Sequence, residues 1–184
     1  MTRLVALCGY PQAGKSQVQR ILTDLYGLVA VDDARPLREA VCTLYGLTPW
    51  HVETQAGKSS LVPVGDTDVE VRTLLAELGA HLEARDPFHK PRTALARARA
   101  EHPGRPLVFG SVRQGQARFL RDQIDTLVVE VTRPGVTART PYDRYDRDAI
   151  DFTIANDSDL DTLARRVRTA FDPVFGASVS IAAE

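Results

Sequence analysis

The strongest constraint on the fold is a short motif near the start of the chain. Residues 4–8 form an apolar run, and residues 9–16 that follow read G-Y-P-Q-A-G-K-S. This segment matches the pattern G-x-x-x-x-G-K-S/T, in which glycines let backbone N–H groups turn inward around a phosphate at the start of a helix. The apolar run before the motif and the helical pattern after it are the expected context of such a P-loop.

The side chains of this motif have separate predicted roles. Lys15 is predicted to reach the β- and γ-phosphates of a nucleoside triphosphate, and the Ser16 hydroxyl is predicted to bind Mg²⁺. The full set of predicted nucleotide-binding residues in the loop is Gly9, Gln12, Ala13, Gly14, Lys15, Ser16 and Gln17.

A second stretch repeats only the end of the motif. Gly57, Lys58 and Ser59 copy its last three positions, but Val52 stands where the first glycine is required and no strand is predicted before it. We interpret this match as accidental, and we favour a solvated Lys58 over one that contacts a ligand.

Composition and charge narrow the class of protein. A chain of 184 residues with 43% hydrophobic and 26% charged residues suits one globular domain, and a net charge of −1 gives no general attraction to nucleic acid. Cys8 and Cys42 form no C-x-x-C motif and share no ligand spacing with the histidines, so neither a disulfide framework nor a zinc site is expected. The chain shows no leader and no apolar run of membrane-spanning length, and we therefore expect a cytoplasmic protein.

Apolar periodicity predicts strands that alternate with helices. The expected strands are short buried runs at residues 4–8, 28–31, 107–109, 126–131 and 152–154. The expected helices lie at residues 17–26, 36–45, 68–85, 94–100, 116–122 and 160–171. Residues 46–68 contain several glycines and prolines and are predicted to be an irregular segment that covers a ligand. The alternation predicts an α/β fold with a parallel sheet and ligands at the carboxyl ends of its strands.

Charged residues follow three of the predicted strands. Asp32 and Asp33 come after the second strand, where each is predicted to bind a ligand or, equally, to cap the next helix. Arg113 follows the third strand, where its planar guanidinium suits a phosphate group. Arg133 follows the fourth strand.

Further arginines lie outside the predicted sheet. On sequence grounds Arg72 is most often a surface residue, and a group of three arginines is interpreted as a solvated face: Arg92, Arg97 and Arg99. Residues 133–149 mix arginines, aspartates and tyrosines with almost no aliphatic residues, so we expect an exposed and mobile segment. It is interpreted either as a solvated loop of ion pairs or as a lid that closes on phosphates through Arg139, Arg144 and Arg147.

Taken in order, these motifs resemble those of the bacteriophage deoxynucleoside monophosphate kinases, within the wider nucleoside-monophosphate-kinase group of P-loop proteins. The resemblance runs from Leu4 to about Val167. Beyond the P-loop it rests on blocks that follow one another along the chain: Pro36-Leu37-Arg38-Glu39-Ala40, Val71-Arg72-Thr73-Leu74-Leu75 with Leu78-Gly79, Val112-Arg113-Gln114, Val131-Thr132-Arg133-Pro134-Gly135, and Ile154-Ala155-Asn156-Asp157-Ser158.

The resemblance implies a three-layer P-loop kinase fold, a five-stranded parallel sheet in the order 2-3-1-4-5, and the reaction ATP + dNMP → ADP + dNDP with Mg²⁺. It implies a single domain over residues 1–184, divided into three parts: a core at residues 1–45, 107–132 and 150–172, a monophosphate-binding insert at about residues 46–101, and a lid at about residues 133–149. It also suggests a homodimer that acts on small molecules, with no nucleic acid or membrane partner, in the cytoplasm of a host cell if the source is a phage.

The resemblance assigns roles to particular side chains. The acceptor monophosphate would be bound by Arg38, Arg72 and Arg113, with Asp33 as a further substrate-binding candidate. Arg133 would lie near the adenine or the hinge of the lid. Transfer would be assisted by a set of cationic side chains: Lys15, Arg113, Arg139, Arg144 and Arg147.

The chain departs from the family at two positions. The family usually has an acidic residue two places before the arginine matched by Arg113, where this chain has Ser111, and an aromatic residue near Asp33. Ser16 remains the predicted metal ligand of the P-loop. The acidic residue that would support the metal is therefore expected to be Asp32 or Asp33.

Two other functions are considered. Another small-molecule P-loop kinase, of the dephospho-coenzyme A or shikimate type, would use Asp32 and Asp33 to bind substrate hydroxyls. A P-loop regulatory module would hydrolyse its nucleotide slowly and would need a water-positioning residue and ordered switch segments. The several arginines favour an acceptor that carries a phosphate.

Overall fold

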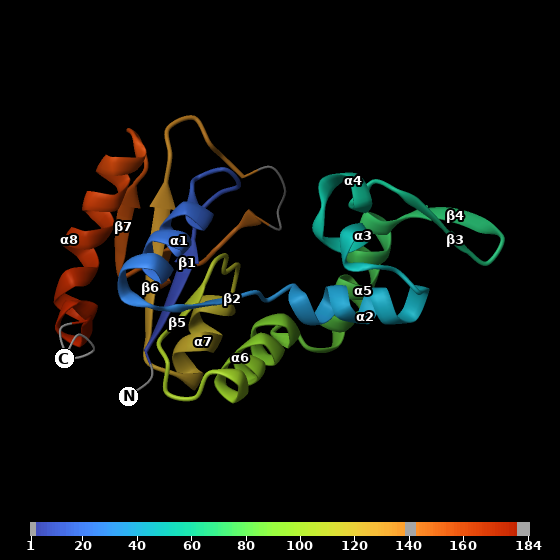
Figure 1. Cartoon of the computed structure of the whole chain (residues 1–184), viewed down its shortest axis with the longest axis horizontal. Coiled ribbons are helices and arrows are strands. Elements are labelled where there is room, and N and C mark those ends of the chain that lie inside the picture. The colour runs from blue at the N-terminus through green and yellow to red at the C-terminus, as the bar shows by residue number, and fades with distance from the viewer. Residues whose placement is uncertain (1–2, 139–142, 180–184) are drawn as a thin grey trace. The chain divides into compact units, whose positions relative to one another are not determined.

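The structure is a computed structural model of the chain, and it describes residues 3–138 and 143–179. Figure 1 shows its helices and strands. No helix within the described residues is long and apolar enough to cross a membrane.

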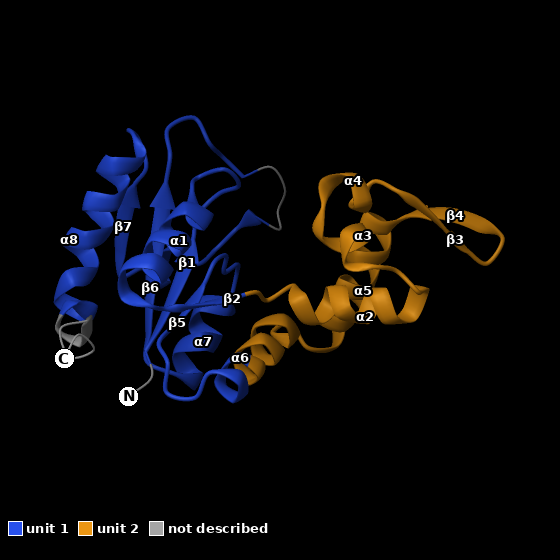
Figure 2. Cartoon of the chain, viewed as in Figure 1, with its two compact units in different colours: residues 1–31, 98–184 blue, residues 32–97 orange. Residues whose placement is uncertain are grey.

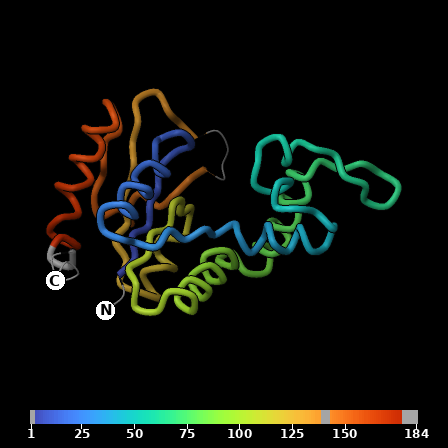
Figure 3. Tube along the Cα trace, in the orientation of Figure 1, coloured from blue at the N-terminus to red at the C-terminus, as the bar shows by residue number. Residues whose placement is uncertain are grey.

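The chain divides into two compact units, which Figure 2 shows in different colours. The first unit comprises residues 1–31 and 98–184, and the second comprises residues 32–97. The trace in Figure 3 can be followed out of the first unit after residue 31 and back into it near residue 98.

The first unit is built on a five-stranded parallel sheet in the order β2-β5-β1-β6-β7. Its strands are β1 (Leu4–Cys8), β2 (Val29–Val31), β5 (Leu107–Phe109), β6 (Thr126–Thr132) and β7 (Phe152–Ala155). When only the strands of this sheet are numbered along the chain, the order is 2-3-1-4-5, as the resemblance implies. β1 lies at the centre, and all five of its residues are buried because strands flank it on both sides.

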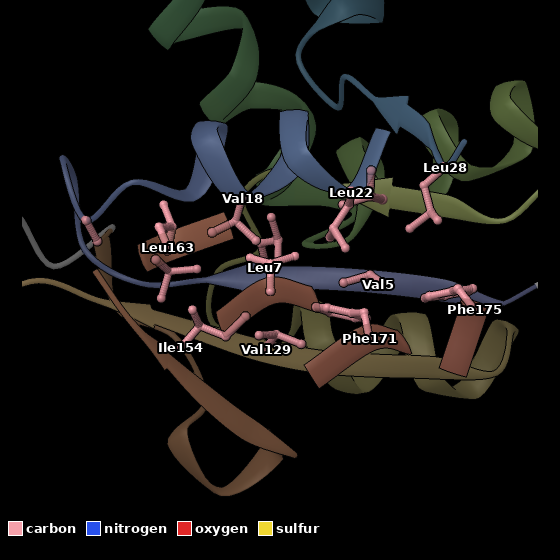
Figure 4. Packing of buried hydrophobic residues seen from close by; sticks show 14 residues of the cluster. Val5, Leu7, Val18, Leu22, Leu28, Val129, Ile154, Leu163, Phe171 and Phe175 are labelled. Atoms are coloured by element: carbon pink, nitrogen blue, oxygen red, sulfur yellow. The ribbon is translucent and has the colours of Figure 1, made fainter. Parts of the chain in front are cut away.

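Helices cover both faces of this sheet. α1 (Lys15–Tyr26) and α8 (Leu160–Val179) pack on one face, where α1 contributes Val18 and α8 contributes Phe171 to the core drawn in Figure 4. α7 (Gln116–Gln123) packs against β6, and its Leu120 is fully buried. Gly27 ends α1 with a φ of 66°, a backbone conformation that glycine adopts without steric cost.

The last helix is longer than the sequence predicted. α8 continues past Phe171 through Pro173 to Val179. Phe175 follows Phe171 by one helical turn, and both rings pack near Tyr26 of α1, at centroid distances of 5.9 and 6.5 Å. Burial of this second aromatic ring explains why the helix extends beyond the predicted end.

The second unit contains helices α2 (Arg35–Tyr45), α3 (Pro49–Glu53), α4 (Gln55–Lys58), α5 (Val71–Arg85) and most of α6 (His89–Glu101). It also contains an antiparallel hairpin of β3 (Leu61–Val64) and β4 (Thr67–Glu70). Its small core gathers valines and one leucine, namely Val41, Val52, Val62, Val71 and Leu74. The unit begins at Asp32, so it includes α2, which the sequence-based division placed with the core.

The prediction of an irregular segment at residues 46–68 is wrong. This region forms two short helices and the β3–β4 hairpin, which turns at Gly65 with a φ of 61°. The pairing of Leu61 with Glu70 takes residues 68–70 into a strand, so α5 begins at Val71 rather than at residue 68. α6 begins at His89 rather than at residue 94, immediately after a turn in which the Asp86 carboxylate accepts from the Phe88 amide.

Candidate phosphate-binding site

The P-loop between β1 and α1 depends on two glycines. Gly9 has a φ of 137°, and a Cβ atom there would lie 2.3 Å from the carbonyl oxygen of Val131. Gly14 has a φ of 103°, and a Cβ atom there would lie 2.2 Å from Nδ2 of Asn156. Gln12 also has a positive φ, of 69°, although it is not a glycine. The loop therefore has the tight inward turn that a phosphate cradle requires.

Lys15 lies at the start of α1 with its ammonium group folded back over the loop. Its Nζ donates to the carbonyl oxygens of Gly9 and Tyr10, at 2.8 and 3.0 Å. Burial lowers the pKa of Lys15, and the positive charge of Arg113 lowers it further, while Asp143 acts in the opposite direction. The electrostatic influence of Arg113 on Lys15 places the predicted donor lysine and the predicted acceptor arginine in one neighbourhood.

Asn156 fastens the P-loop to the segment that follows β7. Its side-chain Nδ2 donates to the carbonyl oxygen of Ala13 at 2.9 Å, and its backbone N–H donates to the carbonyl oxygen of Thr132 at 2.7 Å. Asn156 is a buried polar residue, so these bonds satisfy groups that water does not reach. Ala13 and Gln17, the remaining predicted loop residues, lie in the loop and in the first turn of α1.

Arg113 lies in the turn after β5, next to β1. Its backbone N–H donates to Oε1 of Gln116 at 2.8 Å, and the Gln116 amide donates back to the Arg113 carbonyl at 3.0 Å. Its Nη1 forms an ion pair with Oδ1 of Asp143 at 3.2 Å. The structure thus confirms the predicted position of Arg113 at the carboxyl end of a strand that neighbours the P-loop strand.

We call residues 143–151 the strap. The strap lies alongside the loop before α7 and alongside α7 itself, and each of its contacts with them joins residues about thirty positions apart in the sequence. Besides the Arg113–Asp143 ion pair, the contacts are Gln114 N–H to the Arg144 carbonyl at 3.0 Å, Gly115 N–H to Oδ2 of Asp146 at 2.7 Å, Arg118 with Asp148, and Arg121 with Asp151 at 2.5 Å. The Asp146 carboxylate accepts at the N-cap position of α7, where negative charge is favourable.

The expectation of an exposed segment is therefore wrong for Ala149, which is buried, while Arg144, Arg147 and Asp148 are exposed as expected. Ion pairs of Asp148 and Asp151 with α7 hold this part of the chain, in agreement with the interpretation of the segment as a loop of ion pairs. Arg144 is exposed, and Nη2 of Arg147 donates to the Tyr10 hydroxyl of the P-loop at 3.2 Å. Arg139 lies outside the described residues.

The sequence did not predict a buried carboxylate that lies under the strap. Glu130 of β6 is 8% exposed, and it accepts hydrogen bonds from the Tyr145 hydroxyl at 2.7 Å and from the Thr153 hydroxyl at 2.9 Å. The Tyr145 ring packs against the Tyr10 ring, with 5.4 Å between the ring centroids. A charged residue in the otherwise apolar run T-L-V-V-E-V-T is the signal that could have identified it.

A cavity of about 200 Å³ lies beside this cluster, within the first unit. Its lining joins the P-loop residue Tyr10 to Arg133 after β6 and to Arg147 of the strap. The predicted nucleotide-binding Arg133 thus shares a cavity with two residues that contact each other.

The loop can hold a metal ion only with help from a ligand's own oxygens. Ser16 is exposed in the first turn of α1, where its hydroxyl can reach an ion at the mouth of the glycine cradle. Among the described residues no cluster of three histidine, cysteine or acidic side chains is present that could hold a metal ion by itself. This donor set fits a Mg²⁺ ion that is bound mainly through phosphate oxygens and water.

The other predicted ligand residues lie in the second unit. Asp32 accepts from the Ala34 N–H at 3.1 Å and forms an ion pair with Arg38, so its carboxylate serves the start of α2. Asp33 lines a cavity of about 270 Å³ together with Leu37 of α2 and apolar residues of α5. Asp32 and Arg38 line another cavity, of about 440 Å³, between α2 and α3.

Arg72 is exposed, and its Nη2 donates to Oε1 of Gln55 at 3.0 Å. The three arginines interpreted as a solvated face have partners in the fold, because Arg92 pairs with Asp86, Arg97 pairs with Glu39, and Arg99 donates to the Gln123 carbonyl.

The second G-K-S sequence is not a P-loop. Its glycine lies in α4, where a Cβ atom on Gly57 would lie 2.1 Å from the carbonyl oxygen of Trp50. Close packing between α3 and α4 therefore accounts for this glycine. Lys58 at the end of α4 is half-buried rather than fully solvated.

No family model and no curated protein matches this chain. Solved structures do. A dephospho-CoA kinase from Campylobacter jejuni is 11% identical, with 97% of this chain and 100% of that chain covered and a TM-score of 0.57. A protein named TT1252 from Thermus thermophilus is 18% identical, with 94% and 98% covered and a TM-score of 0.52. The chain has a P-loop kinase fold. At these identities the likeness establishes the arrangement of the P-loop kinase fold and leaves the substrate to be argued from the residues.

Proposed function

We propose that this protein is an ATP-dependent kinase that phosphorylates deoxynucleoside monophosphates. The observation that carries the proposal is the proximity of Arg113 to Lys15, at the ends of two adjacent parallel strands. Lys15 belongs to a cradle for the donor phosphates. An arginine beside it suits a second phosphate group, which is the group that a monophosphate acceptor carries.

The chemistry requires little from the protein beyond alignment and charge. The acceptor phosphate oxygen is the nucleophile and is already ionised near neutral pH, so no strong general base is needed. Mg²⁺, held through Ser16 and the donor phosphates, would neutralise charge on the transferred group. Lys15 would bind the β- and γ-phosphates, and the amides of the loop would hold them in place.

The remaining arginines receive roles in the same proposal. Arg38 and Arg72 of the second unit are proposed to bind the acceptor, and Arg133 to lie on the adenine side of the nucleotide. Arg147 is proposed to approach the donor phosphates from the strap, because it already contacts Tyr10 of the P-loop. Arg144, which is exposed, and Arg139 are proposed to complete the lid.

The nearest rival is a kinase whose acceptor is a hydroxyl group, as in dephospho-coenzyme A kinases. Such a reaction needs a carboxylate that is available to the hydroxyl. Asp32 and Asp33 were the sequence-based candidates. The two oxygens of Asp32 already accept from Arg38 and from the Ala34 amide, whereas Asp33 lines the cavity of about 270 Å³. The contacts of Asp32 therefore favour a phosphate acceptor over a hydroxyl group bound by Asp32.

The proposal is tested by product analysis. Purified protein is incubated with Mg²⁺, ATP and one acceptor at a time: the deoxynucleoside and nucleoside monophosphates, dephospho-coenzyme A and shikimate. Anion-exchange chromatography is expected to show a deoxynucleoside diphosphate. Phosphorylation of dephospho-coenzyme A or shikimate alone would support the rival kinases, and ATP hydrolysis that is independent of every acceptor would support a regulatory module.

A further inference from the structure

We infer that Asp143 is a positioning residue that holds the guanidinium of Arg113 in the orientation in which it binds the acceptor phosphate. The inference rests on the proposed function and extends it to a residue that the sequence motifs do not mark. It assigns the strap a role in the geometry of the acceptor site.

The ion pair between these residues is largely withdrawn from water. Nη1 of Arg113 lies 3.2 Å from Oδ1 of Asp143, and the two side chains are 31% and 10% exposed. Charge pairs that are shielded in this way hold their geometry better than pairs on an open surface. The hydrogen bonds with Gln116 already fix the Arg113 backbone, so Asp143 restrains the far end of a long flexible side chain.

Asp143 begins the strap, and the next residues of the strap are held in place. Arg144 accepts a backbone hydrogen bond from Gln114, and the Asp146 carboxylate accepts from the backbone N–H of Gly115, both in the loop before α7. Tyr145, between them, is anchored to the buried Glu130. Displacement of Asp143 would disturb these contacts, so its carboxylate acts as a fixed support rather than a movable one.

The positive charges near the P-loop are a second argument for the role of Asp143. Arg113 and Lys15 are both positive, and the effect of Arg113 on the pKa of Lys15 shows that each is within electrostatic reach of the other. Asp143 opposes that effect. A carboxylate within electrostatic reach of two cations lowers the repulsion between them before any phosphate arrives.

The opposite role would leave a different signature. If Asp143 merely occupied the place of the acceptor phosphate, its carboxylate would compete with the acceptor, and its removal would improve acceptor binding. A positioning residue has the reverse effect, because its removal lets the guanidinium leave its productive orientation.

Asp143→Asn separates these roles by the sign of the change. The acceptor kcat/KM is expected to fall about 10- to 100-fold, with a higher acceptor KM and an ATP KM within about twofold of the wild type. Asp148→Asn is the matched control, since it removes an exposed ion pair with Arg118 from the same strap, and it should leave both constants unchanged. Asp143→Glu keeps the charge and should restore part of the loss. An unchanged or lower acceptor KM in Asp143→Asn would overturn the inference.

A double-mutant cycle shows whether Asp143 acts through Arg113. In an Arg113→Ala background, Asp143→Asn should change the acceptor kcat/KM by less than about twofold, because the side chain that it positions is gone. A full 10- to 100-fold loss in that background would contradict the role.

A nuclear magnetic resonance measurement on the ligand-free protein keeps the inference separate from the proposed function. With ¹⁵N-labelled arginine, the Nη1 protons of Arg113, which face Asp143, are expected to exchange with water about tenfold faster in Asp143→Asn than in the wild type or in Asp148→Asn. An equal exchange rate in all three proteins overturns the positioning role. If the exchange rates differ as expected but no monophosphate is phosphorylated, the proposed function fails instead, and Asp143 then positions Arg113 for another ligand.

Discussion

The side-chain amide of Asn156 donates a 2.9 Å hydrogen bond to the carbonyl oxygen of Ala13, and in doing so it joins the segment after β7 to the P-loop. The same amide nitrogen lies 2.2 Å from the position that a Cβ atom on Gly14 would occupy, which is too close for two non-bonded atoms. The glycine of the motif is therefore required twice, by its φ of 103° and by the close approach of Asn156.

Gly14→Ala is expected to distort the P-loop. The added methyl group cannot be accommodated without displacement of Asn156, and the positive φ adds backbone strain. We expect ATP binding, measured by isothermal titration calorimetry, to weaken at least about 100-fold, which corresponds to the loss of several backbone contacts to phosphate.

Gly46→Ala is the control for this change. Gly46 also has a positive φ, of 64°, but a Cβ atom there meets nothing within 4 Å. It should lose about 1 kcal/mol of stability and keep the ATP affinity of the wild type. Equal ATP affinities in Gly14→Ala and the wild type would show that the loop does not bind the nucleotide phosphates.

Tyr145→Phe is expected to destabilise the first unit. The substitution removes the hydroxyl that donates to Glu130 and leaves a buried carboxylate with one partner fewer. The free energy of unfolding, from urea denaturation, should fall by about 1–3 kcal/mol. Tyr45→Phe, at an exposed tyrosine of α2, should change it by less than about 0.5 kcal/mol. A fall of the same size in both variants would mean that the Glu130 contact contributes nothing specific.

Cys8 should make the protein less stable in alkali. Burial, assisted by the negative charge of Glu130, raises the pKa of Cys8 from 9.0 to about 12 in the folded state. Above pH 9 the unfolded chain therefore releases the thiol proton while the folded chain keeps it, and stability falls as the pH rises.

This contribution is measured by comparison with Cys8→Ala. The difference in unfolding free energy between the two proteins should be constant up to pH 8, and then shift against the wild type by at most about 1.4 kcal/mol per pH unit. Groups common to both proteins cancel in this comparison. A difference that stays constant to pH 10.5 would contradict the raised pKa.

Arg113→Ala and Arg72→Ala are expected to damage the acceptor side of the reaction. Each should raise the acceptor KM or lower kcat, by about 100-fold or more for Arg113, while ATP binding remains nearly intact. Steady-state kinetics with each substrate varied in turn separate these effects. Arg20→Ala, at an exposed ion pair on α1, is the matched control and should behave as the wild type. Wild-type turnover of monophosphates by both Arg113→Ala and Arg72→Ala would show that the acceptor site was assigned to the wrong residues.

Much of the fold could be read from the sequence because its signals are local. Each of three confirmed features depends only on residues that are close in sequence: the turn at the P-loop glycines, the strand β1 and the end of α1 at Gly27. The hairpin at residues 61–70 gave no such signal, because Pro63 lies inside a strand and the pairing depends on residues across the turn.

The surroundings of the P-loop were harder to predict for a physical reason. The partners Asn156 and Ala13, or Glu130 and Tyr145, meet only through the packing of separate elements. The few aliphatic residues of the strap predicted a mobile loop. The interpretation as a loop of ion pairs did not identify α7, some thirty residues earlier in the chain, as the partner.

The most direct test of the proposed function compares each deoxynucleoside monophosphate with its own nucleoside, which differs by the acceptor phosphate alone. ADP release is followed in a coupled assay with Mg²⁺ and ATP, with Lys15→Ala as the background. We predict turnover of about 1–100 s⁻¹ with at least one monophosphate, none with the nucleosides, and none in Lys15→Ala. ADP release that is equally fast with nucleosides, or that never exceeds the background with any monophosphate, would contradict the account.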